Sequence, residues 1–156
     1  MSTQEIERKY LVMQPPDGLD AYPHATIIQG YIAIPPEGTE VRLRQKGDRY
    51  FQTIKSKGER IRMELEIELT SAQFEALWPA TEERRVEKIR YDVAYGPYTI
   101  ELDIYQGRLT GLYTAEVEFD TLEACEAFVP PPWFGCELTA DARYKNRNLA
   151  LSGLPT

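Results

Sequence analysis

The sequence predicts an α+β fold class: an eight-stranded antiparallel closed β-barrel with a charged interior and a few helices packed outside. Two observations lead to this fold. Charged and apolar residues alternate with the period of a β-strand in about eight short segments, whereas only three segments carry helix signals. Eight short strands are well suited to a closed barrel. Because 156 residues are the size of one ordinary domain, we expect a single domain covering 1–156.

The strand pattern is clearest between Arg60 and Leu69. Every even position in this segment is arginine or glutamate and every odd position is isoleucine, leucine or methionine, so one face is charged and the other apolar. The remaining strands are predicted, in chain order, at 5–9, 27–34, 41–44, 53–55, 88–90, 100–104 and 115–119. Short segments rich in proline and glycine between them are typical of turns.

Three short helices are predicted. Thr70 and Gln73 form a capping-box pattern, and Pro79 ends that helix after about two turns. The segments 121–128 and 140–151 are the second and third helices. We expect all three to cover apolar surface on the outside of the barrel.

Composition excludes several classes of protein. The formal net charge of −7 argues against a nucleic-acid binder that relies on phosphate neutralisation. No apolar stretch approaches the roughly 18 to 20 residues that span a bilayer, and the N-terminal segment has no signal-peptide core, so we expect a cytoplasmic protein without membrane partners. Cys125 and Cys136 are expected to be free thiols, and the single His24 excludes a multi-histidine metal site.

The charged faces carry an unusual set of like-charged pairs. Carboxylates and cations each recur two residues apart, whereas an ordinary wet strand face mixes signs. The carboxylates are Glu5, Glu7, Glu64, Glu66, Glu101, Asp103, Glu116 and Glu118, and the paired cations are Arg42, Arg44, Lys88 and Arg90. Two carboxylates about 6.6 Å apart on one strand repel by roughly 2.5 kcal/mol at an effective dielectric of about 20. Gathered in one enclosure, they need positive charge among them.

These pairs predict a divalent metal and a polyanion. All-carboxylate ligation favours a hard ion, so we expect Mg²⁺, with Mn²⁺ as a substitute. A convergent set of cations needs an anionic guest, and several phosphates supply it because arginine forks bind phosphate oxygens. The predicted cations are Lys9, Arg42, Arg44, Lys55, Lys88 and Arg90. The chemistry that follows is metal-assisted phosphoryl transfer to water.

The order of these motifs resembles the CYTH superfamily, the triphosphate tunnel metalloenzymes. Glu5-Ile-Glu-Arg-Lys9 has the E-x-E-x-K form that opens this family, and the later charged pairs follow in its order. Gln29-Gly-Tyr-Ile32, Pro132-Trp-Phe-Gly135 and Arg143-Tyr-Lys-Asn146 are similar to short bacterial inorganic tripolyphosphatases. The resemblance implies an eight-stranded tunnel, metal bound by Glu5, Glu7, Glu116 and Glu118, and triphosphate held by the six cations named above.

The resemblance also implies a catalytic role for Tyr31 together with Lys9. Lys9 near this tyrosine would lower the phenol pKa and let Tyr31 activate water. The alternatives are that the metal activates the water while Tyr31 only positions it, or that Tyr31 is a packing residue.

Several other assignments stay open. Glu64, Glu66, Glu101 and Asp103 either bind metal or orient the cations through salt bridges. Arg62 and Lys46 are expected at a solvated rim, together with Lys57, Arg60 and Glu68, with substrate contact as the alternative. Either Arg143 or Lys145 closes the tunnel mouth, or both lie on the surface.

The predicted reaction is hydrolysis of inorganic tripolyphosphate to pyrophosphate and phosphate. The alternatives are another triphosphate-using activity of this family (thiamine triphosphatase, nucleoside triphosphatase or class IV adenylyl cyclase) and a non-catalytic polyphosphate-binding module. The partner is inorganic triphosphate or a small molecule that bears a triphosphate. The oligomeric state is open, with a homodimer among the alternatives.

Overall fold

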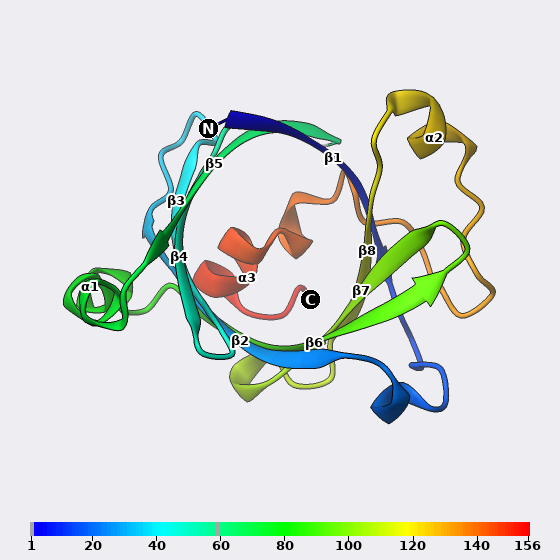
Figure 1. The fold of residues 1–156 in the computed structure, drawn as a ribbon, viewed down its shortest axis with the longest axis horizontal. Helices are drawn as coiled ribbons and strands as arrows, with labels where there is room; N and C mark the ends of the chain where they lie inside the picture. The colour runs from blue at the N-terminus through cyan, green and yellow to red at the C-terminus, as the bar shows by residue number, and fades with distance from the viewer. Residues whose placement is uncertain (1, 59) are drawn as a thin grey trace.

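A computed structural model describes residues 2–58 and 60–156 and contains a closed barrel of eight strands (Figure 1). The strands are β1 (Ser2–Leu11), β2 (His24–Ala33), β3 (Glu40–Lys46), β4 (Arg49–Lys55), β5 (Ile61–Leu69), β6 (Arg85–Tyr95), β7 (Tyr98–Tyr105) and β8 (Tyr113–Glu118). Around the barrel they run in the order β1-β5-β4-β3-β2-β6-β7-β8. The predicted barrel and its strand number are confirmed.

Every neighbouring pair of strands is antiparallel, and the register places charged residues side by side. Lys9 is opposite Glu116 across β1 and β8, and Arg90 is opposite Asp103 across β6 and β7. Because side chains alternate between the two faces of a strand, the residues of each charged pair point into the barrel together. The barrel interior is therefore polar.

Two of the three predicted helices form on the outside of the barrel, as expected. Helix α1 (Ser71–Leu77) begins at Thr70 with a complete capping box, in which Thr70 and Gln73 exchange hydrogen bonds. The chain continues beyond Pro79 as the 3-10 helix η2 (Trp78–Thr81), because proline is compatible with the first turn of a helix. Helix α2 (Leu122–Ala127) begins at Thr121. Two more 3-10 helices are η1 (Leu19–Ala21) and η3 (Gly107–Leu109).

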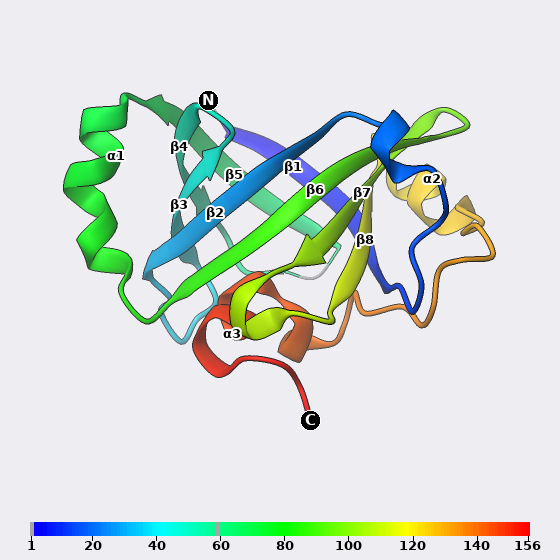
Figure 2. The same cartoon turned by 90° about the horizontal axis from the view of Figure 1, so that it is seen from below.

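The prediction for the third helix was wrong in its extent and its position. The segment forms the 3-10 helix η4 (Ala142–Tyr144) and then helix α3 (Asn146–Ser152), separated by Lys145 in an extended conformation. Helix α3 lies across one end of the barrel instead of against its outer wall (Figures 1 and 2). Leu149 and Ala150 of α3 are buried there against Tyr31 and Tyr105.

The apolar core lies mainly outside the barrel wall. Its larger cluster joins the outer faces of β1, β6, β7 and β8 to α2 and to the segment around Phe134. The outer face of β5 has no such cover: Met63, Leu65 and Ile67 are 47%, 45% and 59% exposed. The expectation that helices cover the outer apolar surface is therefore wrong for β5, because α1 lies to one side of this strand (Figure 1).

Cys125 is buried and Cys136 exposed, and both are free thiols, as predicted. No helix within the described part of the chain has the length and apolar character needed to cross a membrane.

Candidate active site

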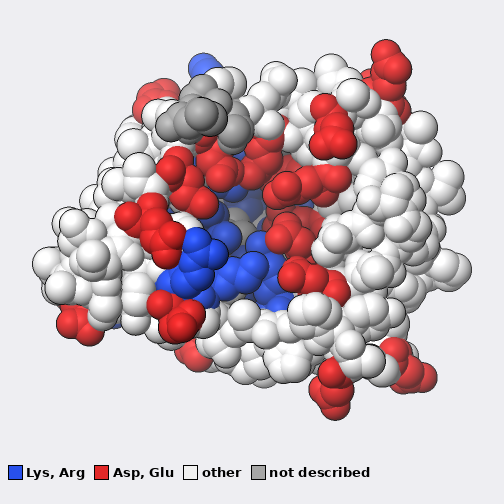
Figure 3. All heavy atoms as spheres, viewed as in Figure 1, with Lys and Arg blue, Asp and Glu red and all other residues white. Residues whose placement is uncertain are grey.

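A cavity of about 220 Å³ occupies the inside of the barrel. One end is open, and there arginine and lysine side chains form the floor of a hollow rimmed by carboxylates (Figure 3). Helix α3 lies at the opposite end. The charged residues that line the cavity are Glu5, Glu7, Lys9, Glu40, Arg42, Arg44, Lys46, Lys55, Arg62, Glu64, Glu66, Arg90, Glu101, Glu116, Glu118 and Lys145.

The structure brings most of the predicted site residues into this cavity, Tyr31 among them. Lys88 and Asp103 are the two that it places elsewhere. Both side chains are 0% exposed and lie behind the lining, with Lys88 Nζ 2.8 Å from Asp103 Oδ2. They therefore contact the lining side chains and not the cavity itself.

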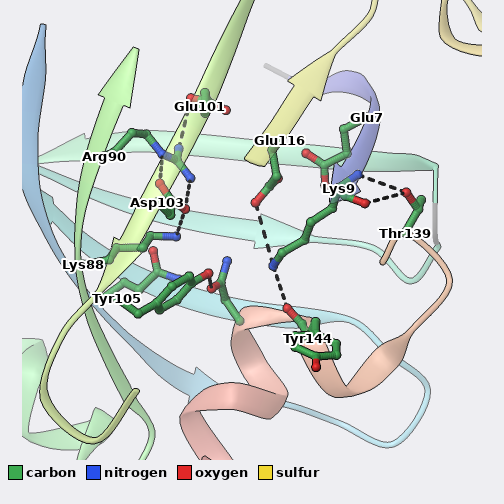
Figure 4. Close-up of polar contacts among 12 residues, drawn as sticks. Glu7, Lys9, Lys88, Arg90, Glu101, Asp103, Tyr105, Glu116, Thr139 and Tyr144 are labelled. Atoms are coloured by element: carbon green, nitrogen blue, oxygen red, sulfur yellow. Dashed lines mark hydrogen bonds and ion pairs between the residues drawn. The ribbon is translucent and has the colours of Figure 1, made fainter. Parts of the chain in front are cut away.

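Asp103 fixes the orientation of Arg90. Its two carboxylate oxygens accept hydrogen bonds from Arg90 Nε and Nη2 at 2.7 and 2.8 Å, and Glu101 accepts from Arg90 Nη1 at 3.0 Å (Figure 4). This fork geometry fixes the orientation of the guanidinium group. Burial raises the pKa of Asp103, but Arg90 and Lys88 outweigh it and lower the pKa to about 2. Burial lowers the pKa of Lys88 to about 7, although Asp103 opposes this shift.

Three carboxylates come together near the open mouth. Oxygens of Glu5, Glu7 and Glu118 lie within 4.8 Å of one another. Burial and then Glu116 raise the pKa of Glu7, while burial and then Glu101 raise the pKa of Glu118 to about 7. Glu7 and Glu118 therefore hold a proton more strongly than free carboxyl groups do, because burial and neighbouring carboxylates disfavour the charged form.

Neighbouring carboxyl groups lie beside one another in this arrangement. Glu7 is hydrogen-bonded to Glu116, and Glu5 to Glu64. Burial and the bond to Glu5 raise the pKa of Glu64 to about 7. Burial would also raise the pKa of Glu5, but Lys55 and the bond from Glu64 outweigh it and lower the value to about 2. A divalent cation beside these carboxylates would neutralise both partners of each pair.

The arginines on β3 carry positive charge that no described carboxylate pairs with in a salt bridge. Arg42 is 4% exposed, and its buried Nε atom has no hydrogen-bond partner among the described residues. Neither Arg42 nor Arg44 forms a salt bridge with a carboxylate in the described ranges. Burial, followed by Arg42 and Arg90, lowers the pKa of Arg44 to about 10. These side chains therefore face the cavity without the anion that buried guanidinium groups require.

Lys9 and Tyr31 lie in the cavity, but they do not interact as expected. Lys9 Nζ donates to the Tyr144 carbonyl at 2.6 Å and lies 4.0 Å from Glu116 (Figure 4). The Tyr31 hydroxyl instead accepts from Gln29 Nε2 at 3.1 Å. Burial and then Glu40 raise the pKa of Tyr31, so the expectation of a lowered phenol pKa is wrong.

The sequence interpretation missed several lining residues. Arg62 was expected at a solvated rim, but its side chain is 12% exposed and lies 3.6, 3.5 and 3.5 Å from oxygens of Glu5, Glu7 and Glu40. Its position two residues before Glu64 on the charged face of β5 is a signal that could have identified it. Lys46 also lines the cavity. Glu68 is exposed and pairs with Arg49, in agreement with a rim position.

The C-terminal segment supplies lining residues that no strand pattern could reveal. Lys145 faces the cavity and its Nζ donates to the Gly58 carbonyl at 2.8 Å, whereas Arg143 is exposed and pairs with Asp141. Asn146 accepts from the Tyr105 hydroxyl at 2.6 Å. These contacts tie the start of α3 to the barrel.

Comparison with known proteins identifies the relatives of this chain. The CYTH domain profile matches residues 3–129. An inorganic triphosphatase of Nitrosomonas europaea is 53% identical over 95% of this chain and 97% of its own length, and one of Acetivibrio thermocellus is 34% identical over 94% and 92%. The crystal structure of an inorganic triphosphatase superposes with a TM-score of 0.72 at 50% identity, covering 97% of each chain.

Proposed function

This chain belongs to the CYTH family, and on that premise we propose that it hydrolyses inorganic triphosphate to pyrophosphate and phosphate inside the barrel cavity. The observation that carries the proposal is a pair of complementary charge imbalances. Arg42 and Arg44 face the cavity without a salt bridge to a described carboxylate, while burial and neighbouring carboxyl groups raise the pKa of Glu7 and Glu64. A polyanion together with a divalent cation satisfies both sets.

The carboxylates at the mouth fit a hard divalent metal. Glu5, Glu7 and Glu118 offer oxygens within 4.8 Å of one another, and Glu116 and Glu64 lie beside Glu7 and Glu5. An all-oxygen donor set selects Mg²⁺, with Mn²⁺ as a substitute. When bound, the ion would supply Lewis-acid stabilisation of negative charge on the phosphoryl oxygens.

The cations of the cavity floor bind and orient the phosphates. Arg42, Arg44 and Arg90 offer guanidinium donors from adjoining parts of the wall, and Lys55 adds a point charge. Glu101 and Asp103 take the orienting role, because both hold Arg90. Lys88 acts through Asp103 and not on the substrate. With these groups in place, water attacks a terminal phosphorus, the bond to the bridging oxygen breaks, and pyrophosphate leaves with that electron pair. The attacking water releases its proton to solvent as phosphate forms.

The dimensions of the cavity favour an inorganic substrate over the alternative activities of the family. Its volume of about 220 Å³ lies below the roughly 300 to 1,000 Å³ of sites for drug-sized ligands. Because α3 covers one end, a nucleoside or thiamine group has to project from the open mouth.

We also propose that 1–156 form a single tunnel domain. The CYTH match ends at residue 129, yet Leu138, Thr139, Lys145 and Asn146 line the same cavity as β1. A cytoplasmic location, the lack of nucleic-acid and membrane partners, and a homodimer as one of the open oligomeric states remain predictions.

The test is phosphate release from tripolyphosphate, ATP, thiamine triphosphate and pyrophosphate, each with Mg²⁺, with Mn²⁺ and with chelator. We expect metal-dependent turnover that is fastest with tripolyphosphate. If no substrate is hydrolysed while tripolyphosphate still raises the melting temperature, the protein is a binding module and the proposed activity is refuted.

A further inference from the structure

Gln29 connects Arg44 to Tyr31 inside the barrel wall. It is 0% exposed on β2, lies opposite Arg44 in the β2–β3 register, and shares a strand face with Tyr31 two residues away. Arg44 Nε donates to Gln29 Oε1 at 3.2 Å, and Gln29 Nε2 donates to the Tyr31 hydroxyl oxygen at 3.1 Å. These three side chains therefore form one hydrogen-bonded row.

The direction of both hydrogen bonds is fixed by chemistry. A guanidinium group has donors only, so the amide oxygen of Gln29 has to face Arg44. Its amide nitrogen then has to face Tyr31, and the phenol oxygen acts as the acceptor in that bond. No described residue accepts the proton of the Tyr31 hydroxyl. Tyr31 is 0% exposed but borders the cavity, so no described acceptor competes with a cavity group for this proton.

We propose that Gln29 is a positioning residue that holds the Tyr31 hydroxyl as a hydrogen-bond donor toward the phosphate bound by Arg44. The inference rests on the proposed triphosphatase function. Burial keeps the phenol protonated, which agrees with a donor and not with a base. A donated bond to a phosphoryl oxygen strengthens as negative charge develops there, so it lowers the barrier more than it tightens binding.

The discriminating variant is Gln29→Glu, which keeps the shape of the side chain but replaces the amide donor by an acceptor. The new carboxylate still accepts from Arg44, but it also accepts from the Tyr31 hydroxyl and so turns the phenol proton away from the cavity. We expect kcat to fall by about 100-fold, as for loss of one donor to a developing charge. Tyr31→Phe should lower kcat by a similar factor, with little change in KM.

The two substitutions should not be additive. In the Tyr31→Phe background, Gln29→Glu should leave kcat unchanged, because the hydroxyl through which Gln29 acts is gone. The negative charge that Gln29→Glu adds should raise KM whether or not Tyr31 is present. Only the effect of Gln29→Glu on kcat should depend on Tyr31. Gln29→Met, which removes the donor without adding charge, should show the same dependence and serves if the carboxylate variant does not fold.

Gln45→Glu is the matched control, because Gln45 lies on the adjoining strand β3 and, among the described residues, its side chain bonds only the exposed Gly47 carbonyl. It should leave kcat unchanged. Additive losses of kcat, or full turnover by Gln29→Glu, would overturn the proposed role of Gln29 but leave the proposed triphosphatase function standing. Wild-type protein that does not hydrolyse triphosphate would overturn the proposed function and this inference together.

Discussion

Replacing Asp103 with asparagine removes the buried carboxylate on which two cations converge. Asp103 and Lys88 are 0% exposed and Arg90 is 7% exposed, and the three ionic contacts measure 2.7 to 2.8 Å. Deleting one partner of a buried ion pair costs about 3 to 5 kcal/mol, because the other charge is left without compensation. In a chain of this length we therefore expect the melting temperature to fall by roughly 6 to 20 °C.

The loss of stability should depend on pH, because the two cations that lose their carboxylate partner differ. Lys88 can release its proton, whereas Arg90 cannot. In the wild type, Lys88 has a folded-state pKa of about 7, lower than its ordinary value, so below that pH the folded protein holds the proton and uses Asp103 to compensate it. The variant lacks that compensation. The stability gap between wild type and Asp103→Asn should therefore widen as the pH falls below about 7.

The assay is urea denaturation of ligand-free protein at pH 6 and pH 9. Glu68→Gln is the control, since it breaks the exposed ion pair with Arg49 and should leave stability unchanged. Two outcomes would refute the assignment of Asp103 as the buried partner of Arg90 and Lys88. One is a loss of less than about 1 kcal/mol in the free energy of unfolding for Asp103→Asn, and the other is a difference from wild type that grows toward high pH.

Two further substitutions test the charge imbalances of the cavity. Arg42→Met should leave the ligand-free protein at least as stable, because Arg42 lowers the pKa of Arg44, and should weaken triphosphate binding about 10- to 100-fold. Isothermal titration calorimetry measures this change, and unaltered affinity would exclude Arg42 from the phosphate site. Glu7→Gln removes a carboxylate whose pKa is raised by burial and by Glu116. It should preserve the melting temperature while raising the Mg²⁺ concentration for half-maximal turnover about 10- to 100-fold, whereas Glu68→Gln should not.

Much of the fold follows from local sequence. The alternation in Arg60–Leu69 needs only the geometry of a strand to separate a charged face from an apolar one, and the capping box at Thr70 specifies a helix start. The same alternation placed Glu5, Arg42 and Arg90 on faces that the structure turns into one cavity. The prediction that helices cover the outer apolar surface was wrong for β5, because apolar residues on a strand face do not reveal whether another element covers them.

The roles of individual site residues depended on tertiary structure. Periodicity shows which face a side chain occupies, but it does not show how deep in the barrel it lies. For this reason Lys88 and Asp103 had the same pattern as Arg90, although only Arg90 reaches the cavity. Arg62 had the pattern of a rim residue, although it lies among three carboxylates.

The sequence by itself determined the period-two alternation, the number of strands and the types of charge that meet inside the barrel, because these properties follow from neighbours along one chain segment. Only the tertiary structure decided that α3 covers one end, that Lys9 bonds the Tyr144 carbonyl, and that Gln29 joins Arg44 to Tyr31. Each of these contacts joins separate elements. Such contacts depend on strand register and on the path of the C-terminal segment, and no local pattern encodes either one.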